Sequence, residues 1–234
     1  MIFNCRYNIV MIDLHLNGAD LLADLSGALA WPGRRLLAVA DLHLEKGSAF
    51  ASRGRLLPPY DTAATLARLE AAIEAHRPET IICLGDSFHD IKGTGRLGRA
   101  DAARLKRLTG SLDWIWIAGN HDPAPPASLG GRAMGEFCLG PLIFRHIAEK
   151  GHVAGEVSGH FHPKAGFSWR GRHVGGRCFI GDGRRLILPA FGAFAGGLDV
   201  RDPAIAGLFS RTARIHILGR MKLHSFAAGQ IADA

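Results

Sequence analysis

The chain has 234 residues with a formal net charge of +7, and 47% of its residues are hydrophobic. This composition excludes a disordered or fibrous protein and provides for a substantial core. No apolar run reaches the roughly 18 residues that a transmembrane helix requires, and the first residues lack the pattern of a signal peptide. The four cysteines are scattered without a CxxC pair, which favours reduced thiols. We therefore expect a cytoplasmic protein that does not associate with a membrane.

Arginine makes up most of the 28 basic residues. Because the guanidinium group binds phosphate in a bidentate manner, this balance favours a polyanionic partner such as nucleic acid. A GC-rich genome also produces chains rich in Ala, Gly and Arg. Composition alone leaves both explanations open.

The pattern of apolar runs predicts the elements in chain order. Residues 8–35 contain short apolar runs broken by NGAD and WPGRR, which indicates antiparallel hairpins. LLAVA at 36–40 is continuous, as in a strand buried on both faces, and a polar loop to Pro59 follows. Residues 60–76 have helical periodicity, with Asp61 or Thr62 as the candidate N-cap.

A second buried strand is expected at 80–84 and a second amphipathic helix at 99–108. Strands follow at 113–118, 142–145 and 153–158, and the shorter spacing beyond Gly166 is typical of a hairpin meander. Strands and helices alternate in the middle, with antiparallel strands at both ends. The sequence therefore predicts an α/β fold in a single domain of residues 1–234.

Five of these strands end in polar residues of similar chemistry. The stops are DLH at 41–43, GD at 85–86, GNHD at 119–122, a histidine at 146 and GHFH at 159–162. In open α/β sheets, functional groups gather at the carboxyl ends of the strands. We therefore expect these five stops to meet at one edge.

The residue types at these stops are those of a metal site. They supply carboxylate, imidazole and amide ligands: Asp41, His43, Asp86, Asn120, His146, His160 and His162. The set is too large for one ion and suits two divalent ions, with Asp86 as the candidate bridge. Asp-x-His and His-x-His place alternate side chains on one side if the backbone is extended. Gly85, Gly119 and Gly159 would permit sharp turns.

In this order, the motifs DLH, GD, GNHD, H and GHFH resemble those of the calcineurin-like metallophosphoesterases. Further stretches, such as CLGDSFHD and LPAFGAFAGGL, resemble the bacterial ligase-associated DNA damage response endonucleases of that family. The resemblance implies a sandwich of two mixed β-sheets flanked by helices. It also implies one ion held by Asp41, His43, Asp86 and His162, and another held by Asp86, Asn120, His146 and His160.

The resemblance further implies that a metal-bridging hydroxide attacks phosphorus while His121 faces the substrate phosphate. Many family phosphatases have an aspartate three residues after the bridging one, and here that position is His89. The partner that orients His121 is therefore open between His89, Asp90 and Asp122. His89 is also a candidate for contact with the substrate. His152 is an alternative to His146 as a ligand.

These observations favour a dinuclear phosphodiesterase that cleaves nucleic acid, and in particular a DNA endonuclease that acts in DNA repair. The alternative is a phosphatase or phosphodiesterase for small molecules or phosphoproteins with the same site. Lys46, Arg53 and Arg145 are the candidate substrate contacts, although loop cations are often only solvated. We expect Mn as the metal, with Fe or Zn as alternatives. The family resemblance adds a DNA ligase and a helicase as partners.

Overall fold

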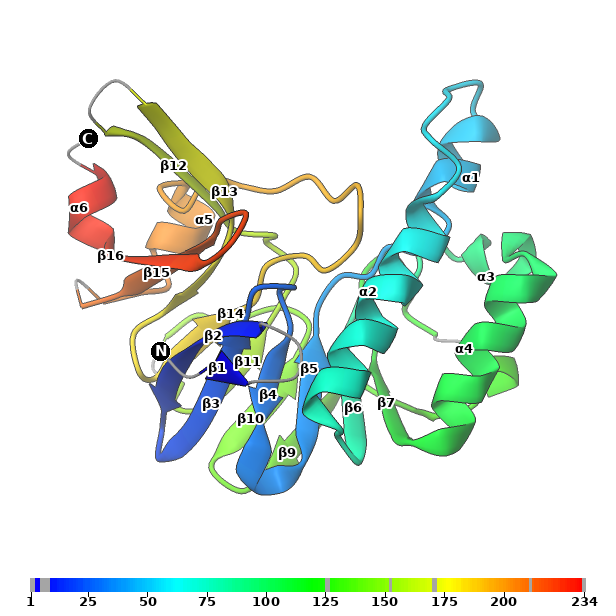
Figure 1. The fold of residues 1–234 in the computed structure, drawn as a ribbon, viewed down its shortest axis with the longest axis horizontal. Helices are drawn as coiled ribbons and strands as arrows, with labels where there is room; N and C mark the ends of the chain where they lie inside the picture. Colours follow the sequence, from blue (N-terminus) through cyan, green and yellow to red (C-terminus); the bar gives the residue numbers. More distant parts are fainter. Residues whose placement is uncertain are drawn as a thin grey trace.

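The computed structural model describes residues 3–4, 9–124, 127–151, 153–169, 172–210 and 212–232. These residues form two mixed β-sheets that pack face to face, with helices on both outer faces (Figure 1). The expected sandwich of two mixed sheets flanked by helices is therefore confirmed. None of the described helices is long and apolar enough to cross a membrane.

The first sheet follows the order of the chain. Its described strands are β1 (Phe3–Asn4), β2 (Ile9–Leu16), β3 (Ala19–Asp24), β4 (Leu29–Trp31), β5 (Leu36–Val39), β6 (Thr80–Leu84), β7 (Asp113–Ile117) and β8 (Arg132–Met134). Strands β1 to β5 pair antiparallel, as the sequence predicts, and β5 to β8 pair parallel. The parallel half places the carboxyl ends of β5, β6 and β7 at the same edge.

The second sheet has the order β16-β15-β13-β14-β11-β10-β9, with β12 paired to β13. Its described strands are β9 (Glu136–Leu139), β10 (Leu142–Arg145), β11 (Glu156–Ser158), β12 (Lys164–Trp169), β13 (Arg172–Gly181), β14 (Arg185–Ile187), β15 (Arg214–Leu218) and β16 (Leu223–Ala227). The predicted hairpin beyond Gly166 is β12 and β13. Strands β10, β11 and β14 are parallel neighbours.

The helices flank the two sheets. They are α1 (Lys46–Ala51), α2 (Asp61–His76), α3 (Gly93–Arg96), α4 (Arg99–Ser111), α5 (Pro203–Ala206) and α6 (Ala228–Ala232), with short 3-10 turns at Pro32–Arg34 and Ala127–Leu129. Helices α2 and α4 cover the first sheet, whereas α5 and α6 lie beside the second (Figure 1).

The continuous apolar runs of the central strands are explained by burial on both faces. In β7, Ile115 and Ile117 pack between the two sheets, while Trp114 and Trp116 pack toward the helices. Both tryptophans are only 1% exposed, so they belong to the core as expected. Successive side chains of β7 point into two different hydrophobic cores, one on each face of the sheet, so no polar residue interrupts the strand.

Two local predictions were wrong. The polar loop expected before Pro59 begins with the short helix α1. Neither Asp61 nor Thr62 caps α2, because the helix begins at Asp61 itself and Tyr60 is the N-cap. The two side chains instead bind the segment around α1: Asp61 Oδ2 accepts from the amide of Gly47 at 2.9 Å, and Thr62 Oγ1 accepts from the amide of Glu45 at 2.9 Å.

Candidate metal centre

The five polar strand ends meet between the two sheets. Asp41 and His43 follow β5, Asp86 follows β6, and Asn120 follows β7. From the second sheet, His146 follows β10, and His160 and His162 come after β11. Parallel pairing within each sheet and packing of the sheets on each other bring these ends together. The predicted convergence is therefore found, but it involves two sheets rather than the edge of one.

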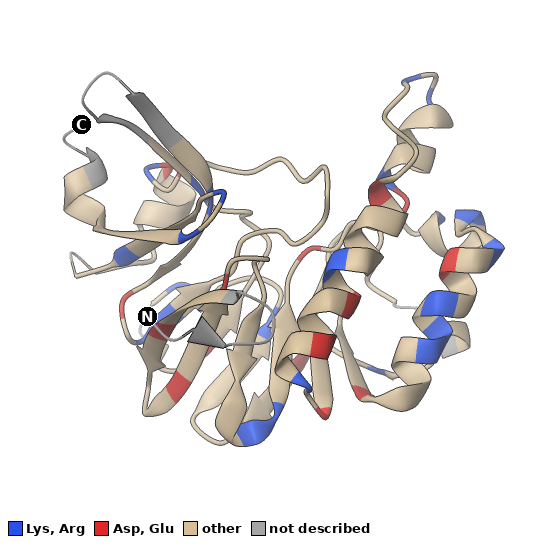
Figure 2. Cartoon of the chain, in the orientation of Figure 1, with Lys and Arg blue, Asp and Glu red and all other residues tan. Residues whose placement is uncertain are grey.

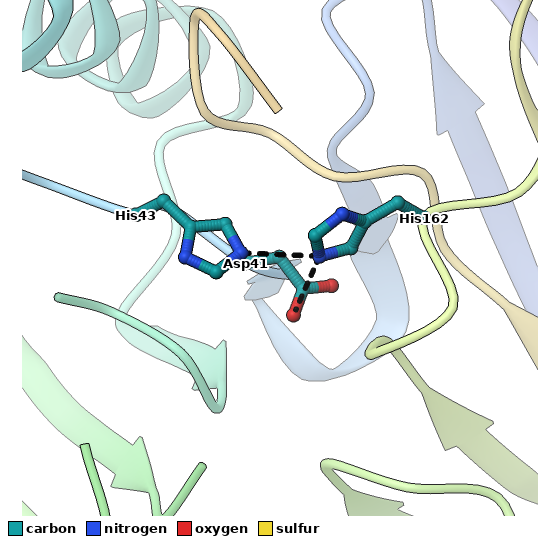
Figure 3. A group of neighbouring side chains, drawn as sticks. All are labelled: Asp41, His43 and His162. Atoms are coloured by element: carbon teal, nitrogen blue, oxygen red, sulfur yellow. Dashed lines mark hydrogen bonds and ion pairs between the residues drawn. The ribbon is translucent and has the colours of Figure 1, made fainter. Parts of the chain in front are cut away.

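The side chains form two groups, each with ligand atoms within 4.8 Å of one another. The first group is Asp41, His43 and His162 (Figure 3). His43 Nε2 lies 3.2 Å from His162 Nε2, which in turn lies 3.4 Å from Asp41 Oδ1. Two ring nitrogens and a carboxylate oxygen therefore converge on a small volume.

The second group is Asp86, His146 and His160. His146 Nε2 lies 3.5 Å from Asp86 Oδ2 and 3.2 Å from His160 Nδ1. Asn120 joins this group, because its Oδ1 lies 2.8 Å from His146 Nε2 and 2.9 Å from His160 Nδ1. His152, the alternative to His146, lies outside the described residues.

The two groups are adjacent. Asp41 Oδ2 accepts a hydrogen bond from the amide of His160 at 2.9 Å, and Asp41 Oδ1 lies 3.8 Å from His146 Nδ1. Asp86 belongs to the second group, but its charge also raises the pKa of His43 in the first, against larger effects that lower it. The bridging role of Asp86 stays a prediction.

The backbone at five of the seven candidate ligands is left-handed rather than extended. The φ angles are 53° at Asp41, 44° at His43, 45° at Asp86, 68° at His160 and 48° at His162. The expected extended Asp-x-His and His-x-His segments are therefore wrong. Non-glycine residues in this conformation are strained, and such strain concentrates at functional sites where the surroundings hold it in place. Here it turns both side chains of each pair into the centre.

The three glycines next to the ligands are required mainly by close approach. A Cβ at Gly119 would collide with the amide nitrogen and Oδ1 of Asp86, and one at Gly159 would lie 2.5 Å from Asp41 Oδ2. Only Gly85 has a positive φ, of 74°, and a Cβ there would also collide with the ring of His146. The expectation of sharp turns therefore holds for Gly85 alone.

The protonation states of His43 and Asp86 and the donor atoms of the centre fit divalent cations. Burial and the neighbouring His162 lower the pKa of His43 to about 3. Burial alone would raise the pKa of Asp86, but hydrogen bonds from His146 and the amide of His121 lower it to about 2. Asp41 Oδ1 is buried and accepts no hydrogen bond from the described residues. Ionised carboxylates and neutral imidazoles are the forms that bind metal.

His121 lies beside the two groups and belongs to neither. Its Nδ1 donates a hydrogen bond to the main-chain carbonyl of His89 at 2.8 Å, and its Nε2 lies 3.9 Å from Asp86 Oδ2. Its side chain is 42% exposed. Among the three candidates left open by the sequence, His89 is therefore the partner of Nδ1, through its backbone.

The other two candidates have different partners. Asp90 Oδ1 accepts from Arg96 Nη2 at 2.7 Å. Asp122 Oδ2 accepts from the amide of Phe88 at 3.0 Å and so holds the loop after β6. Burial raises the pKa of Asp122 to about 7.

The ring of His89 lies in an aromatic cluster next to the centre. Its centroid is 5.5 Å from that of His121 in a stacked arrangement, and 5.6 Å from those of His43 and Phe50. Burial, followed by the charges of Lys46 and His121, lowers its pKa to about 4. Phe50 was not among the sequence candidates, because only the unpredicted helix α1 turns it toward the centre.

The candidate substrate contacts differ in their surroundings. Lys46 Nζ donates to the carbonyl of Phe194 at 2.8 Å, and Arg53 is exposed at the end of α1. Arg145 is only 11% exposed and is surrounded by carboxylates: it pairs with Glu136 at 2.9 Å and with Glu149, and lies 3.6 Å from Glu156. A guanidinium group neutralised in this way is a poor phosphate site, so a substrate contact at Arg145 stays an untested prediction.

Comparison with known proteins agrees with this geometry. A model of the calcineurin-like phosphoesterase family matches residues 34–152. The crystal structure of Pseudomonas putida nuclease MPE shares 32% identity with a TM-score of 0.71, covering 92% of this chain and 100% of that one. The E. coli phosphoesterase YfcE shares 12% identity with a TM-score of 0.40, covering 82% and 98% of the two chains. No curated protein matches the chain. The chain belongs to the calcineurin-like phosphoesterase family, whose members depend on a dinuclear metal centre.

Proposed function

We propose that this protein is a metal-dependent phosphodiesterase that cleaves DNA internally. The observation that carries the proposal is the pair of adjacent ligand groups at one edge of the sandwich. The likeness to a nuclease over 92% of the chain favours nucleic acid over other phosphoesters. The absence of any carboxylate from residues 46–60, beside the centre, also suits a polyanionic substrate.

In this proposal, Asp41, His43 and His162 hold one ion, Asn120, His146 and His160 hold the other, and Asp86 contacts both. Two such ions, when bound, make hydroxide available near neutral pH and neutralise charge on the phosphate. His121 is the proposed acid or charge stabiliser: in its doubly protonated form, Nδ1 donates to the carbonyl of His89 and Nε2 would donate its proton to the leaving oxygen. The neutral ring of His89 backs His121 and contacts the substrate.

The substrate is proposed to approach from the side of Lys46 and Arg53. Next to the second ligand group, a cavity of about 370 Å³ is lined by Asn120, His146 and Arg145, and also by Glu136 and Glu149. These two carboxylates disfavour a phosphate backbone there, whereas the cations Lys46 and Arg53 attract it.

The native metal, the biological role and the partners are inferred from the ligand types and from the family resemblance. We infer Mn as the native metal, with Fe or Zn as alternatives, because the ligands are nitrogen and oxygen atoms without thiolate. A function in DNA repair, together with a DNA ligase and a helicase, is proposed from the family resemblance of the motifs. A cytoplasmic location is proposed from the four cysteines, which are scattered without a CxxC pair.

The test is an activity screen of the Mn-loaded protein. Single-stranded and hairpin DNA, bis-para-nitrophenyl phosphate and para-nitrophenyl phosphate are compared at two salt concentrations, with metal content determined by elemental analysis. We expect two ions per chain and cleavage of DNA that weakens steeply with salt. Hydrolysis of the monoester without nicking of DNA would favour a small-molecule phosphatase instead. A single ion at saturating Mn would overturn the dinuclear centre.

A further inference from the structure

Residues 46–60, which we call the arm, project from the body of the protein near the metal centre. The arm consists of α1 and the loop that leads to α2, and it rises beyond the ends of the neighbouring helices (Figure 1). It carries Lys46, Arg53 and Arg55 but no Asp or Glu. Figure 2 shows basic residues in blue at its far end, whereas the acidic residues in red lie at its base, outside residues 46–60.

The base of the arm is fixed by buried polar side chains. Thr62 Oγ1 accepts from the amide of Glu45 and donates to Glu45 Oε1, each at 2.9 Å. Ser48 Oγ donates to Glu45 Oε2 at 2.6 Å, and Asp61 holds the amide of Gly47. Glu45, Asp61 and Thr62 are 8%, 6% and 4% exposed. Buried hydrogen bonds of this kind resist rearrangement, so both ends of the arm are held together.

The direction of the far end is also defined. Helix α1 is followed by Gly54 with φ +73°, and the amides of Gly54 and Arg55 donate to the carbonyls of Ala51 and Phe50, each at 3.0 Å. This pair of bonds is a Schellman motif, which stops a helix with one left-handed residue. The chain at Arg55 and Leu56 therefore leaves α1 in a set direction.

The far end of the arm is exposed to solvent, and the packing of the described residues does not explain its composition. Leu56 is 91% exposed, more than any other large hydrophobic residue that the structure describes. A single exposed leucine is common on protein surfaces, but this one lies beside Arg53 and Arg55 on a support whose conformation is fixed. The flanking arginines indicate that its partner is an anion.

One face of the arm is turned toward the metal centre and the other is not. On the first face, Phe50 contacts the ring of His89, and Lys46 binds the carbonyl of Phe194. On the other face, a cavity of about 540 Å³ is lined by Leu56 and Pro58 together with Asp61 and Asp101. Carboxylates there repel a polyanion. Leu56 borders this cavity but is 91% exposed, so it is accessible at the tip to a strand that passes on the side of the centre.

We propose that the arm is a second nucleic-acid contact, in which Arg55 binds a backbone phosphate and Leu56 inserts against the faces of the bases. The inference rests on the proposed function and extends it. Apolar side chains that wedge between bases beside cations on the phosphates are a known means of unstacking a nucleic acid. The arm would thus open the strand next to the phosphate to be cleaved.

The test compares Arg55→Ala and Leu56→Ala with two matched controls at exposed positions of the second sheet, Arg184→Ala and Met221→Ala. The readout is kcat/KM for single-stranded DNA divided by kcat/KM for bis-para-nitrophenyl phosphate, a diester too small to span the centre and the tip. We expect each arm variant to lower this ratio roughly tenfold, as for the loss of one base or phosphate contact. The controls should leave it unchanged.

Two further readouts separate the contributions. Arg55→Ala should make the dependence of log(kcat/KM) on log[salt] shallower by about 0.7 to 0.9, the share of one phosphate. Leu56→Ala should abolish the rise in fluorescence of an adenine analogue placed in the oligonucleotide, recorded on rapid mixing before cleavage. If the wild-type protein cleaves DNA and the arm variants match the controls, the arm proposal is wrong while the proposed function stands. If the wild type hydrolyses only the small diester, the proposed function itself fails.

Discussion

The main-chain carbonyl of His89 accepts a hydrogen bond from Nδ1 of His121 at 2.8 Å. Because a carbonyl oxygen can only accept, Nδ1 carries a proton and Nε2 is left to act on the substrate. A phosphatase of this family that uses an aspartate for this purpose adds a negative charge beside the histidine. Here the acceptor is neutral, and the side chain of His89 is left for another use.

Replacement of His121 should separate catalysis from metal binding. His121→Ala should retain both ions, since its ring belongs to neither ligand group, yet kcat should fall by roughly 10²- to 10⁴-fold. Asp86→Ala should instead lose metal and nearly all activity. Elemental analysis and steady-state kinetics of the two variants check this. Loss of metal from His121→Ala would show that its assigned role is wrong.

Gly119 should be irreplaceable because of the space it leaves for Asp86. A Cβ at this position would displace the amide and Oδ1 of Asp86, so Gly119→Ala should weaken metal binding roughly 10- to 100-fold. Calorimetric titration with Mn measures this. Gly110→Ala is the matched control, because Gly110 faces open space in α4 and its replacement should stabilise the helix by up to about 1 kcal/mol. Normal Mn affinity in Gly119→Ala would contradict the steric argument.

Glu156 should be important for stability. It is 0% exposed, its carboxylate pairs with Arg185, and its Oε1 accepts from the amide of Glu149 at 2.8 Å. Glu156→Ala leaves the buried guanidinium group of Arg185 without its counter-charge and should lower the free energy of unfolding by about 3–5 kcal/mol. Urea denaturation provides the measurement.

The control for Glu156 is an exposed ion pair. Asp113 binds Arg132 at 2.8 Å with side chains 48% and 56% exposed, so Asp113→Ala should cost less than about 1 kcal/mol. Equal decreases in the free energy of unfolding of the two variants would mean that burial does not determine the energetic cost of losing an ion pair.

His216 should make the protein less stable in mild acid. Burial, followed by the charge of Arg214, lowers its pKa from 6.5 to about 4 in the folded state. Between these values the unfolded chain binds a proton that the folded chain does not, so stability is complete above pH 6.5 and falls as the pH decreases toward 4. The loss amounts to roughly 3 kcal/mol. Denaturation of the wild type and His216→Gln across this range should show a flatter profile for the variant, and parallel profiles would refute the assignment.

The sequence alone determined the strands and the chemistry of their ends. The run from Trp114 to Ile117 is apolar because both faces of β7 are buried. A strand buried on both faces can be recognised in a sequence as an uninterrupted apolar run. The polar stops after β5, β6 and β7 had to meet because parallel strands end at a common edge. The ligand types and their convergence were therefore predictable.

Only the tertiary structure decided which polar group serves which partner. Asp61 and Thr62 have the sequence signature of a helix cap, yet they bind the amides of Gly47 and Glu45. Likewise, the acceptor for His121 is the backbone of His89 rather than one of the nearby carboxylates. Periodicity reports burial, which is a local property of each strand or helix. A hydrogen bond or ion pair depends on how loops that are distant in sequence approach one another. The pattern of apolar and polar residues does not predict this approach.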